Sequence, residues 1–159
     1  WMVSGVVPPR MANGHANLVP YPAFRAADGV VIVAVGNDRQ FARLCDLIGR
    51  PELARDARFA TNPARVTNRA ALLPILAEAM APRGREEFAS ALEDAGIPAG
   101  PINDVAQVFA DPQVVARGLR IAPGGMPGVA SPIVIDGERQ VSERPSPSPC
   151  DGPSGKYVE

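Results

Sequence analysis

The sequence has little of several features that mark particular functional classes. Its 159 residues include one histidine and two cysteines, and 16 basic residues nearly balance 17 acidic ones, which gives a net charge of −1. Without a basic surplus, neither nucleic acid nor an anionic membrane is indicated as a partner. No apolar run approaches the roughly 18 residues of a membrane-spanning helix. The hydrophobic fraction of 46% is instead ordinary for one globular domain with a buried core.

The cysteines and the N-terminus indicate where the protein works. Cys45 and Cys150 form neither a CxxC motif nor a metal-ligand spacing, so we interpret both as structural and predict no metal site. The N-terminus lacks the charged and apolar regions of a secretory signal. A cytoplasmic protein is therefore predicted. Because the sequence begins with Trp1, and residues 2–7 look like the end of an element already under way, we expect a piece of a longer protein.

The first half of the chain carries the clearest structural signals. Apolar runs at residues 21–26 and 30–35, separated by Asp28-Gly29, predict a β-hairpin. A helix should follow, capped by Asn37 and ended by Gly49. Its apolar positions recur at helical spacing, at Phe41, Leu44, Cys45 and Ile48.

The central segment predicts further helices. After a single helical turn and an irregular link over residues 51–63, an apolar stripe predicts a helix over 64–81, which Pro74 should kink or split. A second amphipathic helix is predicted over 86–95. Residues 97–102 are rich in proline and glycine and are predicted to form a loop.

The last third predicts short elements. Two short helices should begin after Asn103-Asp104 and Asp111-Pro112. Strands are predicted at 119–122 and 130–135, returning to a sheet. The order of elements is a pair of strands, then helices, then a second pair of strands. This order indicates an α+β fold, in which a β-hairpin and short strands pack with several helices.

Motifs of common catalytic sites are absent from the sequence, including GxGxxG, GxxxxGK[ST], GxSxG, HExxH and paired CxxC. His15, the lone imidazole, has no serine or cysteine at a spacing that implies contact. Asn13, Gly14 and Asn17 are compatible with amides that meet a ligand oxygen, but composition alone favours an ordinary turn. Two charged sets are interpreted as solvated helix faces, namely Glu86, Glu87, Glu93 and Asp94, and Arg55, Arg58, Arg65 and Arg69.

Short motifs recur in a distinctive order between about Met11 and Ile135. They are NGHANLVPY at 13–21, ADG at 27–29, VGNDRQF at 35–41, DARFATN at 56–62, AGIPAGPIN at 95–103 and DPQ at 111–113. Together they resemble the smaller domain of the family III CoA-transferases, or CaiB/BaiF family, which includes formyl-CoA transferase and 2-methylacyl-CoA racemases. The resemblance implies an active-site-type loop within residues 1–20, a CoA-transferase small domain at 21–141 and a linker or tail rich in Pro, Ser and Gly at 142–159.

The resemblance also implies that the large and small domains have different roles in the reaction. In the family, an aspartate of a separate large domain attacks an acyl thioester, CoA moves through aspartyl intermediates to a carboxylic acid, and the subunits form homodimers. That aspartate belongs to a segment upstream of Trp1, so no catalytic residue is expected here. Asn13, Gly14 and His15 match the loop that covers the active site. Acyl-CoA and a carboxylate would be substrates, with no tightly bound cofactor.

Two alternatives remain open from the sequence. A racemase-like acyl-CoA enzyme would exchange a proton at the α-carbon instead of transferring CoA. A non-catalytic dimerisation or interaction module would need no chemistry at all. Under the main interpretation, the 159 residues alone are a fragment and should be inactive.

Overall fold

The computed structural model describes residues 2, 3, 5, 7 and 9–145. Cys150 and most of the predicted tail at 142–159 therefore lie outside the described residues. The chain divides into two compact units, Trp1–Ile102 and Asn103–Glu159.

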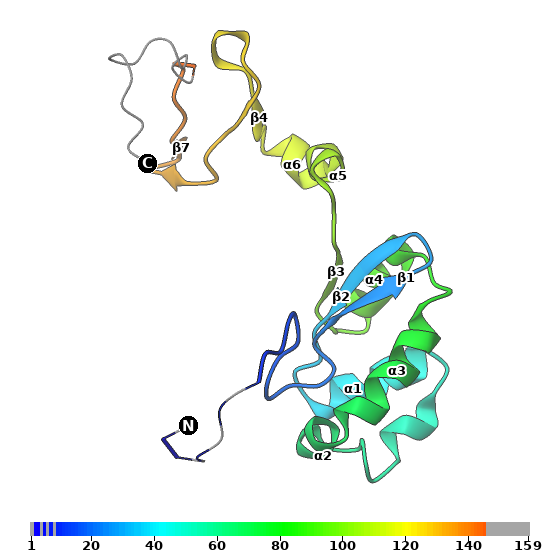
Figure 1. Cartoon of the computed structure of the whole chain (residues 1–159). Coiled ribbons are helices and arrows are strands. Elements are labelled where there is room, and N and C mark those ends of the chain that lie inside the picture. The colour runs from blue at the N-terminus through cyan, green and yellow to red at the C-terminus, as the bar shows by residue number, and fades with distance from the viewer. Residues whose placement is uncertain (1, 4, 6, 8, 146–159) are drawn as a thin grey trace. The chain divides into compact units, whose positions relative to one another are not determined.

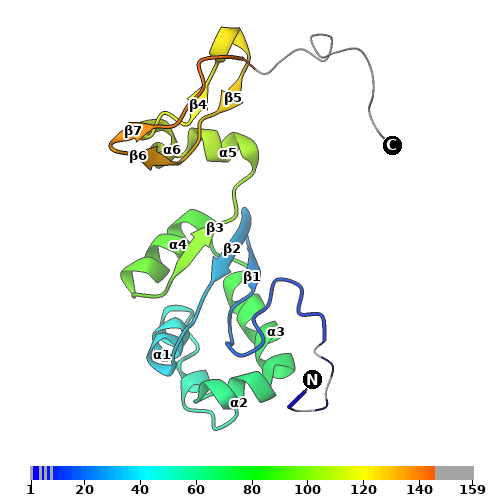
Figure 2. The same cartoon turned by 90° about the vertical axis from the view of Figure 1, so that its left-hand side faces the viewer.

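The first unit combines a small antiparallel sheet with helices (Figures 1 and 2). The sheet has the order β1-β2-β3. The elements of this unit are β1 (Ala23–Ala26), β2 (Gly29–Val33), α1 (Asp38–Leu47), the 3-10 helix η1 (Pro51–Ala54), α2 (Asn62–Thr67), α3 (Arg69–Met80), α4 (Arg85–Asp94) and β3 (Ala99–Pro101).

Alternation along the strands places the core on the helical side of the sheet. Phe24, Val31 and Val33 are buried, whereas Arg25 and Ile32 are exposed. The buried strand residues join side chains from α1, α3 and α4 in one cluster, which includes Phe41, Leu44, Cys45, Leu72, Leu76, Met80, Phe88 and Leu92. The mixed helices and antiparallel sheet confirm the predicted α+β class.

The predicted hairpin is present, but its turn lies one residue earlier than expected. Ala26 pairs with Gly29, so Ala27 and Asp28 form the turn. Gly29 instead begins β2, where a Cβ would lie 2.7 Å from Cδ of Arg85. This glycine is therefore required for close packing against α4 and not for the turn.

The helix predicted over 64–81 is divided at Asn68 and not at Pro74, which lies inside α3. Asn68 Nδ2 donates to Ala64 O over 2.9 Å, which satisfies a carbonyl at the end of α2. The buried residues of α3 are Leu72, Leu76 and Met80. Ala70, an apolar residue of the same helix, is exposed.

The predicted loop at 97–102 is wrong in part, because Ala99–Pro101 forms the edge strand β3. Its register pairs Val31 with Pro101 and Val33 with Ala99. An edge strand tolerates proline because one side of its backbone needs no sheet partner.

The second unit contains only short elements. The predicted helices form as α5 (Val105–Ala110) and α6 (Pro112–Ala116), capped by Asp104 and Asp111. The remaining elements are β4 (Arg120–Ile121), the 3-10 helix η2 (Pro123–Gly125), β5 (Gly128–Val129), β6 (Val134–Ile135) and β7 (Glu138–Arg139). The predicted pairing of 119–122 with 130–135 is wrong in part: Ala130 N donates to Leu119 O, but β4 pairs with β5 and β6 with β7 in separate two-stranded sheets.

None of the helices in the described part of the chain combines the length and apolar character needed to cross a membrane.

Candidate functional site

The loop that carries Asn13, Gly14 and His15 begins with a tight turn. Gly14 N donates to Met11 O over 2.8 Å, and Ala12 adopts a left-handed φ of +50°. This conformation costs a non-glycine residue about 1–2 kcal/mol, so contacts elsewhere must hold it. A Cβ on residue 14 would lie 3.1 Å from Met11 O. The turn therefore favours glycine at this position.

The loop lines a pocket of about 160 Å³. Its walls are formed by Met11, Asn13, Gly14, His15, Leu18, Val19, Tyr21, Pro22, Arg69 and Leu73. The walls offer amide, imidazole, phenol and guanidinium groups, but no carboxylate or thiol. These groups can form hydrogen bonds with the oxygen atoms of a small ligand.

His15 has a defined orientation although it is exposed. Its Nδ1 accepts a hydrogen bond from Asn17 N over 3.0 Å, and its ring lies 5.1 Å from the Tyr21 ring between centroids. Because Nδ1 is an acceptor in this contact, the neutral imidazole carries its proton on Nε2. That N–H is a donor suited to a carbonyl or carboxylate oxygen.

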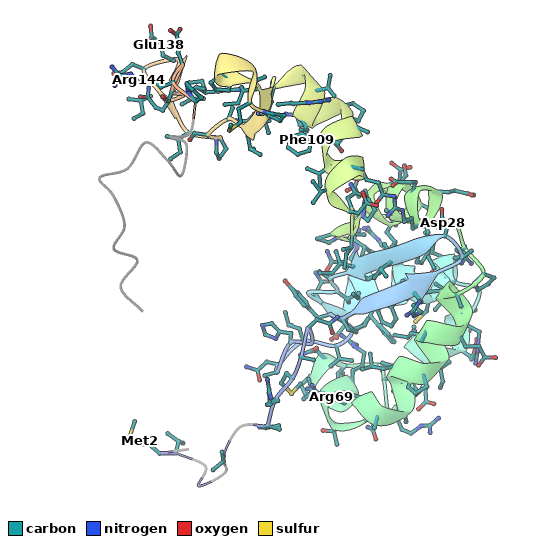
Figure 3. All side chains as sticks on the ribbon, turned by 45° about the horizontal axis from the view of Figure 1, so that its top comes forward. Met2, Asp28, Arg69, Phe109, Glu138 and Arg144 are labelled. Atoms are coloured by element: carbon teal, nitrogen blue, oxygen red, sulfur yellow. The ribbon has the colours of Figure 1, made fainter. Side chains whose placement is uncertain are left out.

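Arg69, at the start of α3, contacts the same loop (Figure 3). Its Nη2 donates to Ala16 O over 2.6 Å and its Nη1 to His15 O over 3.3 Å. Arg69 is half-buried, so the interpretation of its side chain as part of a solvated helix face is wrong. The guanidinium binds two successive carbonyls that no strand partner satisfies.

Arg65 departs further from the predicted solvated face, because its side chain is fully buried. It donates from Nε to Val19 O over 2.6 Å and from Nη1 to Phe59 O over 2.9 Å. Nη2 forms an ion pair with Asp38 over 2.9 Å. Hydrogen bonds to carbonyls and one carboxylate compensate the burial of this charge.

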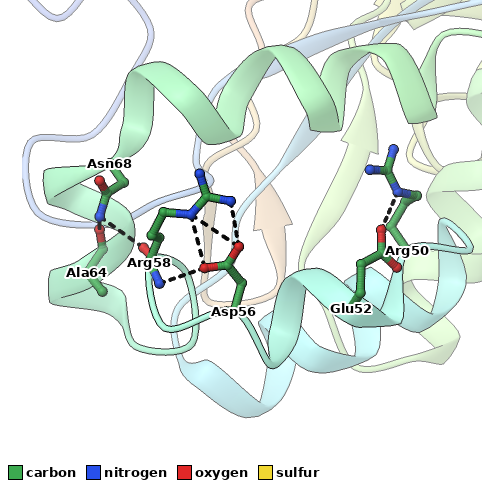
Figure 4. A network of polar contacts seen from close by, with 6 residues as sticks. All are labelled: Arg50, Glu52, Asp56, Arg58, Ala64 and Asn68. Carbon is green, nitrogen blue, oxygen red and sulfur yellow. Dashed lines mark hydrogen bonds and ion pairs between the residues drawn. The ribbon is translucent and has the colours of Figure 1, made fainter.

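The link between η1 and α2 is held by its own polar contacts (Figure 4). Arg58 Nη2 lies 2.6 Å from Asp56 Oδ2, and hydrogen bonds from the Arg58 side chain hold the pKa of Asp56 below its usual range. Asn68 Nδ2 also donates to Arg58 O over 3.2 Å. Within the described residues, neither the hydrogen bonds nor the cation–π contact of the Arg58 side chain involve the loop of Asn13, Gly14 and His15. Arg58 itself remains exposed, as predicted.

The remaining predicted polar sets lie away from this pocket. Glu86, Glu87, Glu93 and Asp94 are exposed on α4, as predicted for a solvated helix face. Cys45 is buried on α1, in agreement with its structural interpretation. Within the described residues, no three His, Cys, Asp or Glu side chains are grouped so that they could hold a metal ion.

The residues that anchor the loop could not be identified from the sequence. The motif at 13–21 pointed to the loop, but nothing in the spacing of Asn62, Arg65 and Arg69 identified them as partners of its backbone. The sequence contains only a weak signal of a shared helix face. The three residues lie three and four positions apart, on a helical segment that begins at the last residue of the DARFATN motif.

Comparisons with known proteins show which family the chain is similar to. The profile of CoA-transferase family III matches residues 1–150. The succinate–glutarate CoA-transferase of Agrobacterium fabrum is 43% identical over 92% of this chain and 38% of its own length. The acetyl-CoA:oxalate CoA-transferase of Acetobacter aceti is 36% identical over 95% of this chain and 39% of its own length.

A solved structure of a CaiB/BaiF family protein from Brucella suis is 47% identical, with a TM-score of 0.81 over 94% of this chain and 40% of that protein. The chain thus spans about two fifths of the length of the relatives it matches. Sequence profile, identity and backbone agree over nearly all of these 159 residues. The chain belongs to CoA-transferase family III.

Proposed function

We propose that this chain is the small-domain part of an enzyme that transfers CoA between an acyl thioester and a dicarboxylic acid. The observation that carries the proposal is the held loop of Asn13, Gly14 and His15, which lines a pocket whose described walls contain no carboxylate or thiol. The dicarboxylate class comes from the names of the relatives, which act on succinate and glutarate or on oxalate.

The chemistry divides between this chain and a large domain. A carboxylate of the large domain attacks the thioester carbonyl and releases CoA thiolate, which leaves a mixed anhydride. The thiolate then attacks the anhydride at the carbonyl that belongs to the enzyme. This step forms an enzyme thioester and releases the donor acid. The acceptor carboxylate repeats these steps in reverse and leaves as its CoA thioester.

The anhydride must be kept from water. The tetrahedral intermediates that form before and after it need hydrogen-bond donors for their oxyanions. Asn13, Gly14 and His15 are proposed to shield and orient the acyl group. A homodimer in the cytoplasm, with an acyl-CoA and a carboxylic acid as substrates and no tightly bound cofactor, completes the proposal.

The test is CoA transfer by the full-length protein from succinyl-CoA to glutarate, measured as formation of glutaryl-CoA by mass spectrometry. Transfer is expected from the full-length protein and none from the 159-residue chain alone. Robust transfer by this chain alone would contradict the assignment of the nucleophile to a large domain. Exchange of the α-proton of a 2-methylacyl-CoA without CoA transfer would instead identify a racemase.

A further inference from the structure

The backbone of the Asn13–Asn17 loop is held by side chains and not by a sheet. Among the described residues, the main-chain hydrogen bonds of segment 12–19 are limited to the turn between Gly14 and Met11. The carbonyls that follow are instead bound by side chains of α2 and α3. The loop therefore takes its conformation from a few donors whose removal can be tested one at a time.

Asn62 and Arg69 bind adjacent parts of the loop. Asn62 Nδ2 donates to Asn17 O over 2.7 Å, and its Oδ1 accepts from Val19 N over 3.2 Å. Arg69 binds the carbonyls of His15 and Ala16. Three successive carbonyls, at residues 15, 16 and 17, thus point to donors of α2 and α3.

Arg65 fixes the end of the loop. It binds Val19 O through Nε, while its other nitrogens bind Phe59 O and Asp38, and its guanidinium lies 4.3 Å from the centroid of the Phe41 ring. These partners belong to α1 and to the link before α2. Arg65 therefore ties the loop to the core of the first unit.

We propose that Asn62, Arg65 and Arg69, which we call the loop clamp, are positioning residues that set the conformation of the Asn13–Asn17 loop. Two of the three are cationic donors, whose hydrogen bonds are stronger than neutral ones. They hold Gly14 and His15 in place before substrate arrives, so that little ordering is required during the reaction. The effect on the reaction rests on the proposed function, whereas the effect on the loop does not.

Two substitutions weaken the clamp while sparing the core. Arg69→Met keeps an unbranched, mostly apolar side chain and removes the guanidinium donors. Asn62→Asp keeps the acceptor for Val19 N, removes the donor to Asn17 O, and places a carboxylate in the first turn of α2, where it is favourable. Arg58→Met is the matched control, because this arginine is 62% exposed and pairs with Asp56, not with the loop.

The first measurement is hydrogen–deuterium exchange in the full-length protein. Loss of a clamp hydrogen bond should accelerate exchange of the hydrogen-bonded amides of the loop, those of Gly14 and Asn17, about tenfold or more in Arg69→Met and in Asn62→Asp. Exchange in β2 and α1 should stay unchanged, and Arg58→Met should resemble the unsubstituted protein. Unchanged loop exchange in both clamp variants would overturn the proposal.

The second measurement is the ratio of acyl-CoA hydrolysis to CoA transfer. A loosened loop admits water, so both clamp variants should raise this ratio several-fold. A merely structural defect lowers the amount of active enzyme and leaves the ratio constant. Faster loop exchange with a constant ratio would overturn the functional part of the proposal. If the unsubstituted protein transfers no CoA, the proposed function fails, while the exchange measurement still decides whether the clamp holds the loop.

Discussion

At the scale of single residues, Cys45 shows how burial controls thiol chemistry. Its side chain is fully buried in α1 beside Phe41 and Leu44. Burial raises the pKa of the thiol from its ordinary value of 9.0 to about 12, and the charge of Asp46 acts in the same direction. The folded protein therefore keeps this thiol protonated at pH values where an unfolded chain begins to lose the proton.

This difference predicts that the free energy of unfolding decreases as pH rises from 9 toward 12. The contribution is fully present below the unfolded pKa of 9.0 and is lost as pH approaches the folded value of about 12. The slope from one proton is at most about 1.4 kcal/mol per pH unit. Urea unfolding at pH 8, 9 and 10 should show it in a Cys150→Ser background.

The control for this prediction adds Cys45→Ala to the same background. That change removes the titrating group, so the decline above pH 9 should become shallower even if the variant is less stable at every pH. Parallel pH dependences with and without Cys45 would contradict the prediction.

At the scale of elements, α1 depends on its N-terminal cap. Asn37 Oδ1 accepts from Gln40 N over 2.9 Å, and Gln40 Oε1 accepts from Gly36 N over 2.8 Å. Asn37→Ala should lower the free energy of unfolding by about 1 kcal/mol, because a donor in the first turn loses its partner. Urea unfolding measures the change. Asn37→Ser, which preserves a capping oxygen, is the control and should lose little, and equal losses in both would exclude capping as the cause.

The same helix shows which elements the sequence could predict. A cap, an apolar period and a terminal glycine are all local signals in α1, and the structure confirms them. β3 has no such signal, because its strand character comes from pairing with β2, far away in the sequence. The division at Asn68 is likewise a local change of backbone conformation, to φ −101° and ψ 21°, that the apolar period does not record.

Some residues of the candidate site could likewise be predicted from the sequence, and others could not. The motif around Asn13, Gly14 and His15 could be read from the sequence as a loop. Arg65 was interpreted as solvated because arginine is rarely fully buried. Its burial requires the carbonyls of Val19 and Phe59 and the carboxylate of Asp38, which only the fold brings together.

At the scale of the whole molecule, the two units differ in how much apolar surface they bury. The core cluster belongs entirely to the first unit. Among the described residues of the second unit, Ala130 is the only buried hydrophobic one. Several large apolar side chains there are more than half exposed, including Val105 at 74%, Val129 at 66% and Val115 at 62%.

This contrast predicts that amide protection in the 159-residue chain changes sharply between Ile102 and Asn103. Amides of β2, α1 and α3 open only with the cooperative core and should be protected by several orders of magnitude. Amides of α5 and β4 should be protected no more than about a hundredfold, because helices of this length are marginal without apolar burial. Hydrogen–deuterium exchange with peptide-level detection measures both units in one sample, so the first unit is the internal control. Protection of α5 equal to that of α3 would contradict the prediction, because it would show that packing at residues other than Ala130 stabilises the second unit.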